Sequence, residues 1–139
     1  MTNRTLHAVA AAACGVLLFV ANVPAWAHHS FAAEYDANKP ITVKGTVTKV
    51  EWTNPHARFY VDVKDDSGKV INWNFELASP NVLIRNGWTR KSLKEGDNVS
   101  VSGSMAKDGA NMANARNVTL ADGRRVFAGS GGAEGGPNQ

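Results

Sequence analysis

Apolar and polar residues alternate in several short runs of this chain, and turn-forming residues separate the runs. The clearest runs cover residues 41–47, 58–63 and 70–77. Alternation with a period of two is typical of β-strands that bury one face. Turn-forming sequences stand between or after such runs, at residues 65–68, 108–109 and 122–123. The chain is therefore predicted to fold mainly into short β-strands.

One short helix interrupts the predicted strands. Ser79 suits an N-cap, Pro80 suits the first helical position, and Gly87 suits the residue just after the end. The predicted order is then three strands, a helix and two strands, which is the order of the OB-fold, a five-stranded Greek-key barrel. A β-sandwich is the alternative, but it needs about seven strands. We predict an all-β, OB-fold-like barrel over residues 41–127.

The tryptophans and one change of phase locate the predicted core more closely. Val50 and Trp52 are apolar on the opposite parity from residues 41–47, so a bulge or sharp bend is expected before them. Trp73 falls on the inward parity and is predicted in the core, and Trp88 is expected to plug one end of the barrel. Trp52 suits core packing and the wall of a site equally.

The first 27 residues resemble a secretory signal peptide. Arg4 gives a positive start, an apolar run follows, and Ala25-Trp26-Ala27 offers small residues at a cleavage site. A transmembrane anchor is the alternative, although the unbroken apolar run is shorter than the roughly 20 residues that span a bilayer. Cleavage after Ala27 would leave a cysteine-free mature chain, because Cys14 lies in the leader. The mature protein is expected in the periplasm or secreted, with no stable membrane insertion.

Two further segments flank the predicted barrel. Residues 28–40 are predicted as an N-terminal segment that packs on it, in which 31–35 pairs antiparallel with the first strand after a turn at 36–40. That turn would carry His28 and His29 toward Trp52 and His56. Residues 128–139 are rich in glycine and are predicted to form a disordered tail.

Four short motifs carry a family resemblance. They are His28-His29-Ser30-Phe31-Ala32, Trp52-Thr53-Asn54-Pro55-His56, Gly87-Trp88 and Gly96-Asp97-Asn98-Val99. On these motifs the chain resembles an uncharacterised family of small exported bacterial proteins, a domain of unknown function. The resemblance runs to about Arg125, and it implies no activity, ligand or partner.

The histidines provide the sharpest candidate for chemistry. Cleavage after Ala27 would free an α-amino group on His28, and this group with the imidazole of the same residue makes a chelating pair. A further imidazole from His29 or His56 would complete a nitrogen-rich site that suits Cu(II) above zinc. The terminal histidine resembles the histidine brace of copper monooxygenases and exported copper carriers. The alternative is a polar, flexible N-terminus, with His56 only orienting its loop.

A second candidate site lies on the polar face of the second and third predicted strands. In OB-folds these strands form the usual binding face. The candidate ligand-binding residues are Trp52, Arg58, Tyr60, Asn74 and Glu76. A solvated sheet face is the alternative, since polar residues are ordinary there.

The net charge and the absence of common enzyme motifs limit the classes of function that we expect. The formal charge of +3 includes Arg4, so the mature chain carries only +2, which is too mild to indicate nucleic-acid binding. None of the common hydrolase, zinc-protease or nucleotide-binding motifs occurs. We expect a non-enzymatic, monomeric binding or carrier module that holds a copper-type ion at His28, His29 and His56. The alternative is a metal-free module that binds a peptide, glycan or envelope protein, and a copper-brace enzyme is a more distant third class.

Overall fold

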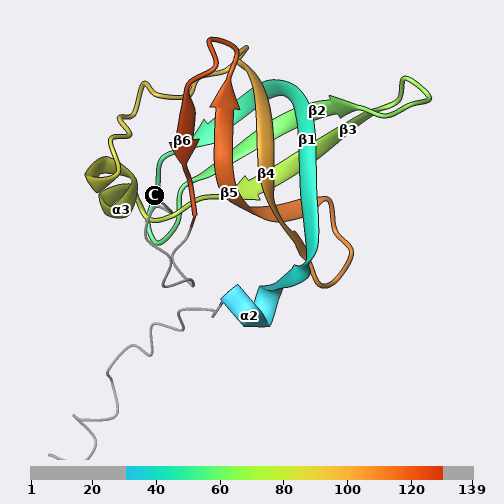
Figure 1. The fold of residues 1–139 in the computed structure, drawn as a ribbon, viewed down its shortest axis with the longest axis horizontal. Coiled ribbons are helices and arrows are strands. Elements are labelled where there is room, and N and C mark those ends of the chain that lie inside the picture. Colours follow the sequence, from blue (N-terminus) through green and yellow to red (C-terminus); the bar gives the residue numbers. More distant parts are fainter. Residues whose placement is uncertain (1–30, 130–139) are drawn as a thin grey trace, which may run out of the picture.

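The computed structural model describes residues 31–129, and this part of the chain is mostly β. Two short helices accompany six strands (Figure 1). In chain order the elements are α2 (Phe31–Glu34), β1 (Tyr35–Glu51), β2 (Arg58–Lys64), β3 (Val70–Glu76), α3 (Pro80–Arg85), β4 (Asn98–Ala106), β5 (Met112–Leu120) and β6 (Arg125–Phe127). The predicted succession of three strands, a helix and two strands is present, followed by one more short strand.

The six strands form one sheet that returns on itself. Its order is β3-β2-β1-β4-β5-β6, and an additional pairing joins β3 to β5. That pairing is parallel and short, from Asn74 opposite Met112 to Glu76 opposite Asn114. The strands therefore make a ring, from which the turn between β2 and β3 projects (Figure 1).

Strand β1 is long and pairs with two neighbouring strands, one after the other. Its first part pairs with β4, and its second part pairs with β2 from Thr46 opposite Asp62 onward. The β2 register shifts between Val47 and Lys49. An extra residue at that point changes which face the following side chains occupy. The irregularity predicted before Val50 is thus confirmed.

The core lies inside the ring and follows the predicted alternation. Phe59, Val61 and Phe75 are fully buried, and the Phe59 and Phe75 rings stack with centroids 5.3 Å apart. Trp73 is buried in the same cluster, as predicted. Trp88 is also buried, and its indole N–H donates to the carbonyl of Phe127. The same cluster includes residues of β1, β4, β5 and α3, so the core is enclosed by the ring and by the helix and loop after β3.

The helix α3 begins and ends as its sequence predicts. The Ser79 side chain accepts a hydrogen bond from the Val82 amide, and Pro80 occupies the first turn. Gly87 has a φ of 86°, the left-handed conformation that commonly follows a helix end. Leu83 faces inward and is fully buried. Neither helix in residues 31–129 has the length and apolar character needed to cross a membrane.

The predicted return of residues 31–35 along the first strand is wrong. Phe31–Glu34 is helical, and Tyr35 continues directly into β1. The turn-forming residues at 36–40 produce an irregularity in the β4 pairing instead of a reversal, since Tyr35 pairs with Ala106 and Pro40 with Ser104. Asp36 accepts a hydrogen bond from the Asn38 amide there. Asp36 and Asn38 thus form a local hydrogen bond of the kind found in turns, but the chain continues in the same direction.

The ordered fold reaches beyond the predicted boundary at residue 127. Ala128 is fully buried, its N–H donates to the Arg116 carbonyl, and its carbonyl accepts from the Ala78 N–H. Ala128 was expected in the glycine-rich tail, but it ties β5 to the segment before α3. The rest of the predicted tail, from residue 130, lies outside the described residues, as does the predicted signal peptide.

Candidate functional site

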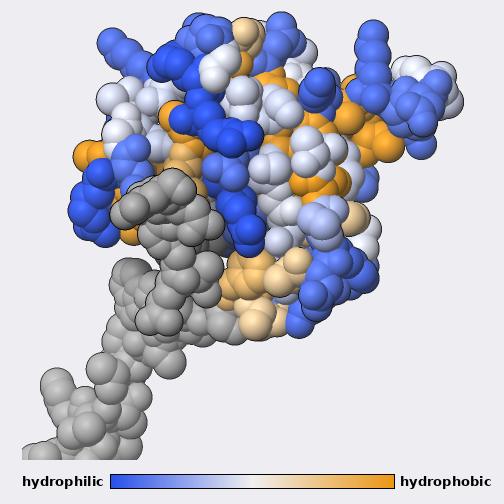
Figure 2. Space-filling model, in the orientation of Figure 1, coloured by the Kyte–Doolittle hydropathy of each residue, from blue (hydrophilic) through white to orange (hydrophobic). Residues whose placement is uncertain are grey.

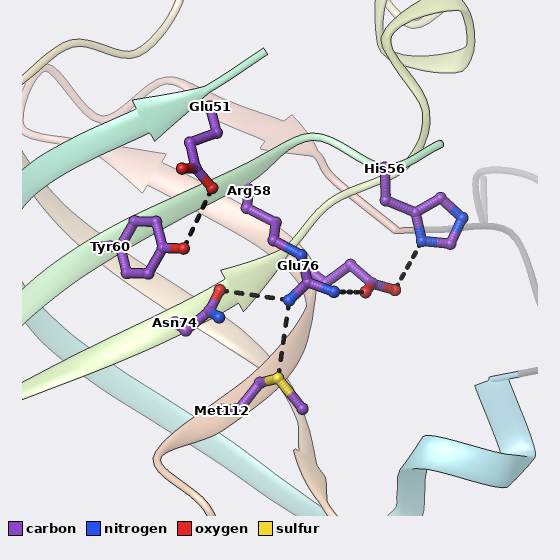
Figure 3. A network of polar contacts seen from close by, with 7 residues as sticks. All are labelled: Glu51, His56, Arg58, Tyr60, Asn74, Glu76 and Met112. Carbon is purple, nitrogen blue, oxygen red and sulfur yellow. Dashed lines mark hydrogen bonds and ion pairs between the residues drawn. The ribbon is translucent and has the colours of Figure 1, made fainter. Parts of the chain in front are cut away.

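A polar cluster lies where β2 begins and β3 ends. His56 stands in the connection after β1, Arg58 is the first residue of β2, and Glu76 is the last residue of β3. Arg58 and Glu76 are direct cross-strand partners. Figure 3 shows the Glu76 carboxylate between the other two side chains. The sheet register therefore brings Glu76 to His56 and Arg58, which precede it by 20 and 18 residues.

Both oxygens of the Glu76 carboxylate are engaged. Oε1 lies 2.8 Å from Nδ1 of His56, and Oε2 accepts a hydrogen bond of 2.5 Å from Nη2 of Arg58. The Glu76 side chain is only 5% exposed, whereas those of His56 and Arg58 are 28% and 29% exposed. A buried carboxylate requires such partners because an unpaired charge is costly away from water. Glu76 thus holds the imidazole ring in one orientation.

The orientation of His56 decides which nitrogen it offers. With Nδ1 directed at a carboxylate, the proton belongs on Nδ1 and the lone pair on Nε2. Within residues 31–129, no side chain or backbone group forms a hydrogen bond with Nε2. In Figure 3 this second ring nitrogen faces away from Glu76. In that tautomer His56 presents Nε2 as an oriented nitrogen donor.

Arg58 makes further contacts that keep it in place. Its Nη1 donates to Oδ1 of Asn74 at 3.5 Å and lies 3.7 Å from the sulfur of Met112. Asn74 and Met112 face each other across the pairing that closes the ring. The cluster is thus attached to the seam between β3 and β5 (Figure 3).

Tyr35, at the start of β1, belongs to the same cluster and was not predicted. Its side chain is 2% exposed, and among the described residues its hydroxyl has no hydrogen-bond partner within normal geometry. Burial raises the pKa of Tyr35 far above its ordinary value, and the nearby Glu76 charge adds to the rise. A buried hydroxyl without a partner is uncommon. Its sequence context showed only a turn-rich segment, so alternation could not identify it.

A second polar group lies beside the cluster on the same sheet face. The Tyr60 hydroxyl donates to Oε2 of Glu51 at 3.1 Å, and the Lys49 ammonium lies 2.5 Å from Oε1 of Glu51. The same ammonium is 5.3 Å from the centroid of the Tyr60 ring. The hydrogen bonds from Lys49 and Tyr60 lower the pKa of Glu51. This group is paired internally, with Lys49 exposed to water and Glu51 and Tyr60 partly buried.

The structure brings five of the predicted site residues together on the outer face of β2 and β3 and in the loop before β2: His56, Arg58, Tyr60, Asn74 and Glu76. Glu76 departs from the solvated face expected for these strands, because the β3–β5 pairing and the Tyr35 segment cover it. Trp52 is partly buried and packs against the core. His28 and His29 lie outside the described residues. Within residues 31–129, no three His, Cys, Asp or Glu side chains form a metal-sized group.

Comparisons with known proteins identify a family and no characterised relative. A model described as "Family of unknown function (DUF6152)" matches residues 16–115. No curated protein and no solved structure matches the chain significantly.

Proposed function

Since the chain belongs to DUF6152, a family of unknown function, as the motif resemblance indicated, we infer its function from the site. We propose that the protein is an exported, non-enzymatic module that binds or carries a copper-type metal ion. The observation that carries this proposal is the 2.8 Å contact between Nδ1 of His56 and the buried Glu76 carboxylate. Metal-binding histidines commonly donate their second ring N–H to a carboxylate, which fixes the tautomer and strengthens the donor nitrogen. Arg58 completes the support by holding the other oxygen of Glu76.

The remaining ligands would come from the mature N-terminus. We propose His28, with its α-amino group freed by cleavage after Ala27, and His29. Only Ser30 separates His29 from Phe31 in the sequence, and the Phe31 ring lies 5.7 Å from that of Tyr35. Tyr35 in turn interacts with Glu76 and Arg58. Each residue of extended chain spans roughly 3.3–3.6 Å, so three residues reach about 10 Å from Phe31.

The donor set favours copper over the other common metals. Imidazole and amine nitrogens suit Cu(II), and no cysteine thiolate remains after cleavage to favour zinc or an iron–sulfur cluster. The described residues supply His56 as one oriented donor, so the site would be complete only with the N-terminal histidines. Bound metal would thereby join the N-terminus to the loop before β2.

We propose that the ring of strands is an OB-fold-type barrel. Supporting this are the helix between β3 and β4, the bent β1 shared by two neighbours, and the closing β3–β5 pair. Residues 1–27 are proposed as the signal peptide of a periplasmic or secreted monomer. Intact-mass measurement of the exported protein tests this, and a chain that begins elsewhere than at His28 would contradict it.

Copper titration of the processed protein tests the metal site. We expect about one equivalent of Cu(II), a d–d absorption band, and nitrogen couplings in the EPR spectrum. His56→Ala and an extra alanine ahead of His28 should each weaken binding at least about tenfold, because each removes a nitrogen donor. Glu76→Gln should weaken it about tenfold through the orientation of His56. Asn72→Ala, on the exposed part of β3, is the matched control and should bind as the wild type does.

Unchanged copper affinity in both the His56→Ala and the extended variant would refute the metal site. The alternative function would then be a metal-free module that binds a peptide, glycan or envelope protein on the β2–β3 face. In that case Tyr60→Ala or Arg58→Ala should abolish partner binding, while His56→Ala should not affect it.

A further inference from the structure

Part of strand β1 has an edge that no strand within residues 31–129 covers. Residues 41–46 pair with β4, but the pairing with β2 begins only at Thr46 opposite Asp62. In residues 31–129, residues 41–44 therefore have a strand on one side alone, whereas Gly45 already lies against Asp62 of β2. In Figure 1 the hairpin of β2 and β3 diverges from β1 at this point and projects away from the ring.

The direction of the backbone groups follows from the hydrogen bonds at Val47. The Val47 N–H donates to the Asp97 carbonyl, and the Val47 carbonyl accepts from the Gly96 N–H, so this residue faces β4. Alternate residues of an antiparallel strand bond to the same neighbour. Val43 and Gly45 therefore face β4 as well. The N–H and C=O groups of Thr42 and Lys44 face the uncovered side.

The place where the strands diverge is hollow, and its two lysines exceed its one aspartate by a single positive charge. An open hollow of about 650 Å³ is lined there by Lys44 and Gly45 of β1, Asp62 and Lys64 of β2, and Val70 of β3. On its other side the hollow continues along residues 98–100 of β4 and residues 119–121 at the end of β5. Among the described residues, neither Lys44 nor Lys64 has an ion-pair partner. Val70 is 49% exposed, and Figure 2 shows apolar surface at the base of the projecting hairpin.

We propose that this edge of β1, residues 41–44, binds an extended peptide segment of a partner protein that carries acidic side chains. The peptide would add a strand beside β1 and bond to the backbone of Thr42 and Lys44, which is how many sheet edges recognise peptides. Its acidic side chains would face Lys44 and Lys64. Its apolar side chains would lie toward the partly buried Ile41 and Val43.

The lysines argue against a second copy of this chain as the occupant. Lysine on an edge strand discourages pairing with another copy, because like charges then face each other. The same charges attract a carboxylate-bearing strand. Within residues 41–44 there is also no proline and no register shift to block pairing. The proposal does not depend on the proposed metal site, which lies where β2 begins and β3 ends, whereas the hollow lies where β2 ends and β3 begins.

Two labelled hexapeptides test the proposal with the processed full-length protein. One alternates valine with glutamate, and its control alternates valine with lysine. We expect the glutamate peptide to bind at least about tenfold more tightly, as judged by fluorescence anisotropy at low salt. Combining Lys44→Glu with Lys64→Glu should reverse this preference. Lys91→Glu, at an exposed lysine outside the hollow, is the matched control and should leave the preference unchanged.

The backbone part of the proposal has its own test. Lys44→Pro removes one N–H that faces the open edge and none that bonds β4, so it should fold and lose peptide binding. If this variant does not fold, amide hydrogen exchange of the wild type replaces it. Saturating glutamate peptide should slow exchange at Thr42 and Lys44. Unchanged exchange there, equal affinity for both peptides, or sedimentation as a dimer joined at this edge would overturn the proposal.

Discussion

Single residues in this protein show how burial changes a polar side chain. Glu76 and Tyr35 are both almost fully buried and lie next to each other, yet their situations differ. The Glu76 carboxylate has two strong partners, His56 and Arg58. The Tyr35 hydroxyl has none within normal geometry among residues 31–129. The Glu76 side chain is therefore held by hydrogen bonds, whereas burial keeps Tyr35 as the neutral phenol by raising its pKa.

The buried phenol predicts sensitivity to alkaline pH. The pKa of Tyr35 is raised from its ordinary value of 10.0 because burial disfavours the phenolate. The native state then holds a proton that the unfolded state releases above pH 10, so this stabilisation is complete below pH 10 and decreases above it. Relative to Tyr35→Phe, the wild type should lose about 1.4 kcal/mol of unfolding free energy per pH unit. Urea unfolding at pH 8, 10 and 11 measures this, and an equal difference at all three values would contradict it.

At the scale of the elements, β1 organises the fold. It pairs with β4, shifts register near Thr48, and then pairs with β2. The two strands approach closely where their pairing begins, and Gly45 lies at that point. A Cβ atom at Gly45 would lie 2.2 Å from the Asp62 carbonyl oxygen and 2.7 Å from Cγ1 of Val61. Glycine is therefore needed at this position for space.

Alanine substitution separates the need for space at Gly45 from the need for a positive φ at a turn glycine such as Gly68. Gly45→Ala should lower the free energy of unfolding by about 3 kcal/mol, because backbone and core would have to move. The control, Gly68→Ala, has nothing within 4 Å of the added atom but a φ of 85°, so it should cost only about 1 kcal/mol. Urea denaturation compares the two variants. A smaller loss for Gly45→Ala than for Gly68→Ala would show that β1 and β2 can separate freely.

For the whole molecule, closure of the ring determines where the domain ends. The short β3–β5 pairing joins distant parts of the chain, and Ala128 reinforces the same region. Ala78, whose N–H donates to the Ala128 carbonyl, is 2% exposed. The fold therefore requires Ala128, which follows the last strand, β6.

Two truncations test this boundary. A chain that ends at Phe127 leaves the Ala78 N–H buried without its acceptor, which typically costs about 1–3 kcal/mol. A chain that ends at Gly129 keeps both hydrogen bonds of Ala128. Thermal unfolding should therefore give a lower Tm for the shorter chain. Equal Tm values would place the end of the stable domain before Ala128.

Local sequence patterns were sufficient for β2, β3 and α3 and for their buried faces, but not for the helix at Phe31–Glu34. The alternation of Phe59 and Val61, and of Trp73 and Phe75, identified the inward side of β2 and β3, because side chains of a strand alternate strictly. Ser79 and Pro80 identified the start of α3 through its cap. These features depend on residues a few positions apart, so the sequence alone determines them.

Tertiary contacts decided the features that depend on distant residues. The turn chemistry at 36–40 indicated a break but not its direction, which the β4 pairing determined. Alternation placed Glu76 on an outer face, and only the closing of β3 against β5 buried it beside Tyr35. Strand periodicity specifies a face and not the neighbour that covers it, because that neighbour comes from another part of the chain. The cluster around His56 therefore follows from the ring as a whole.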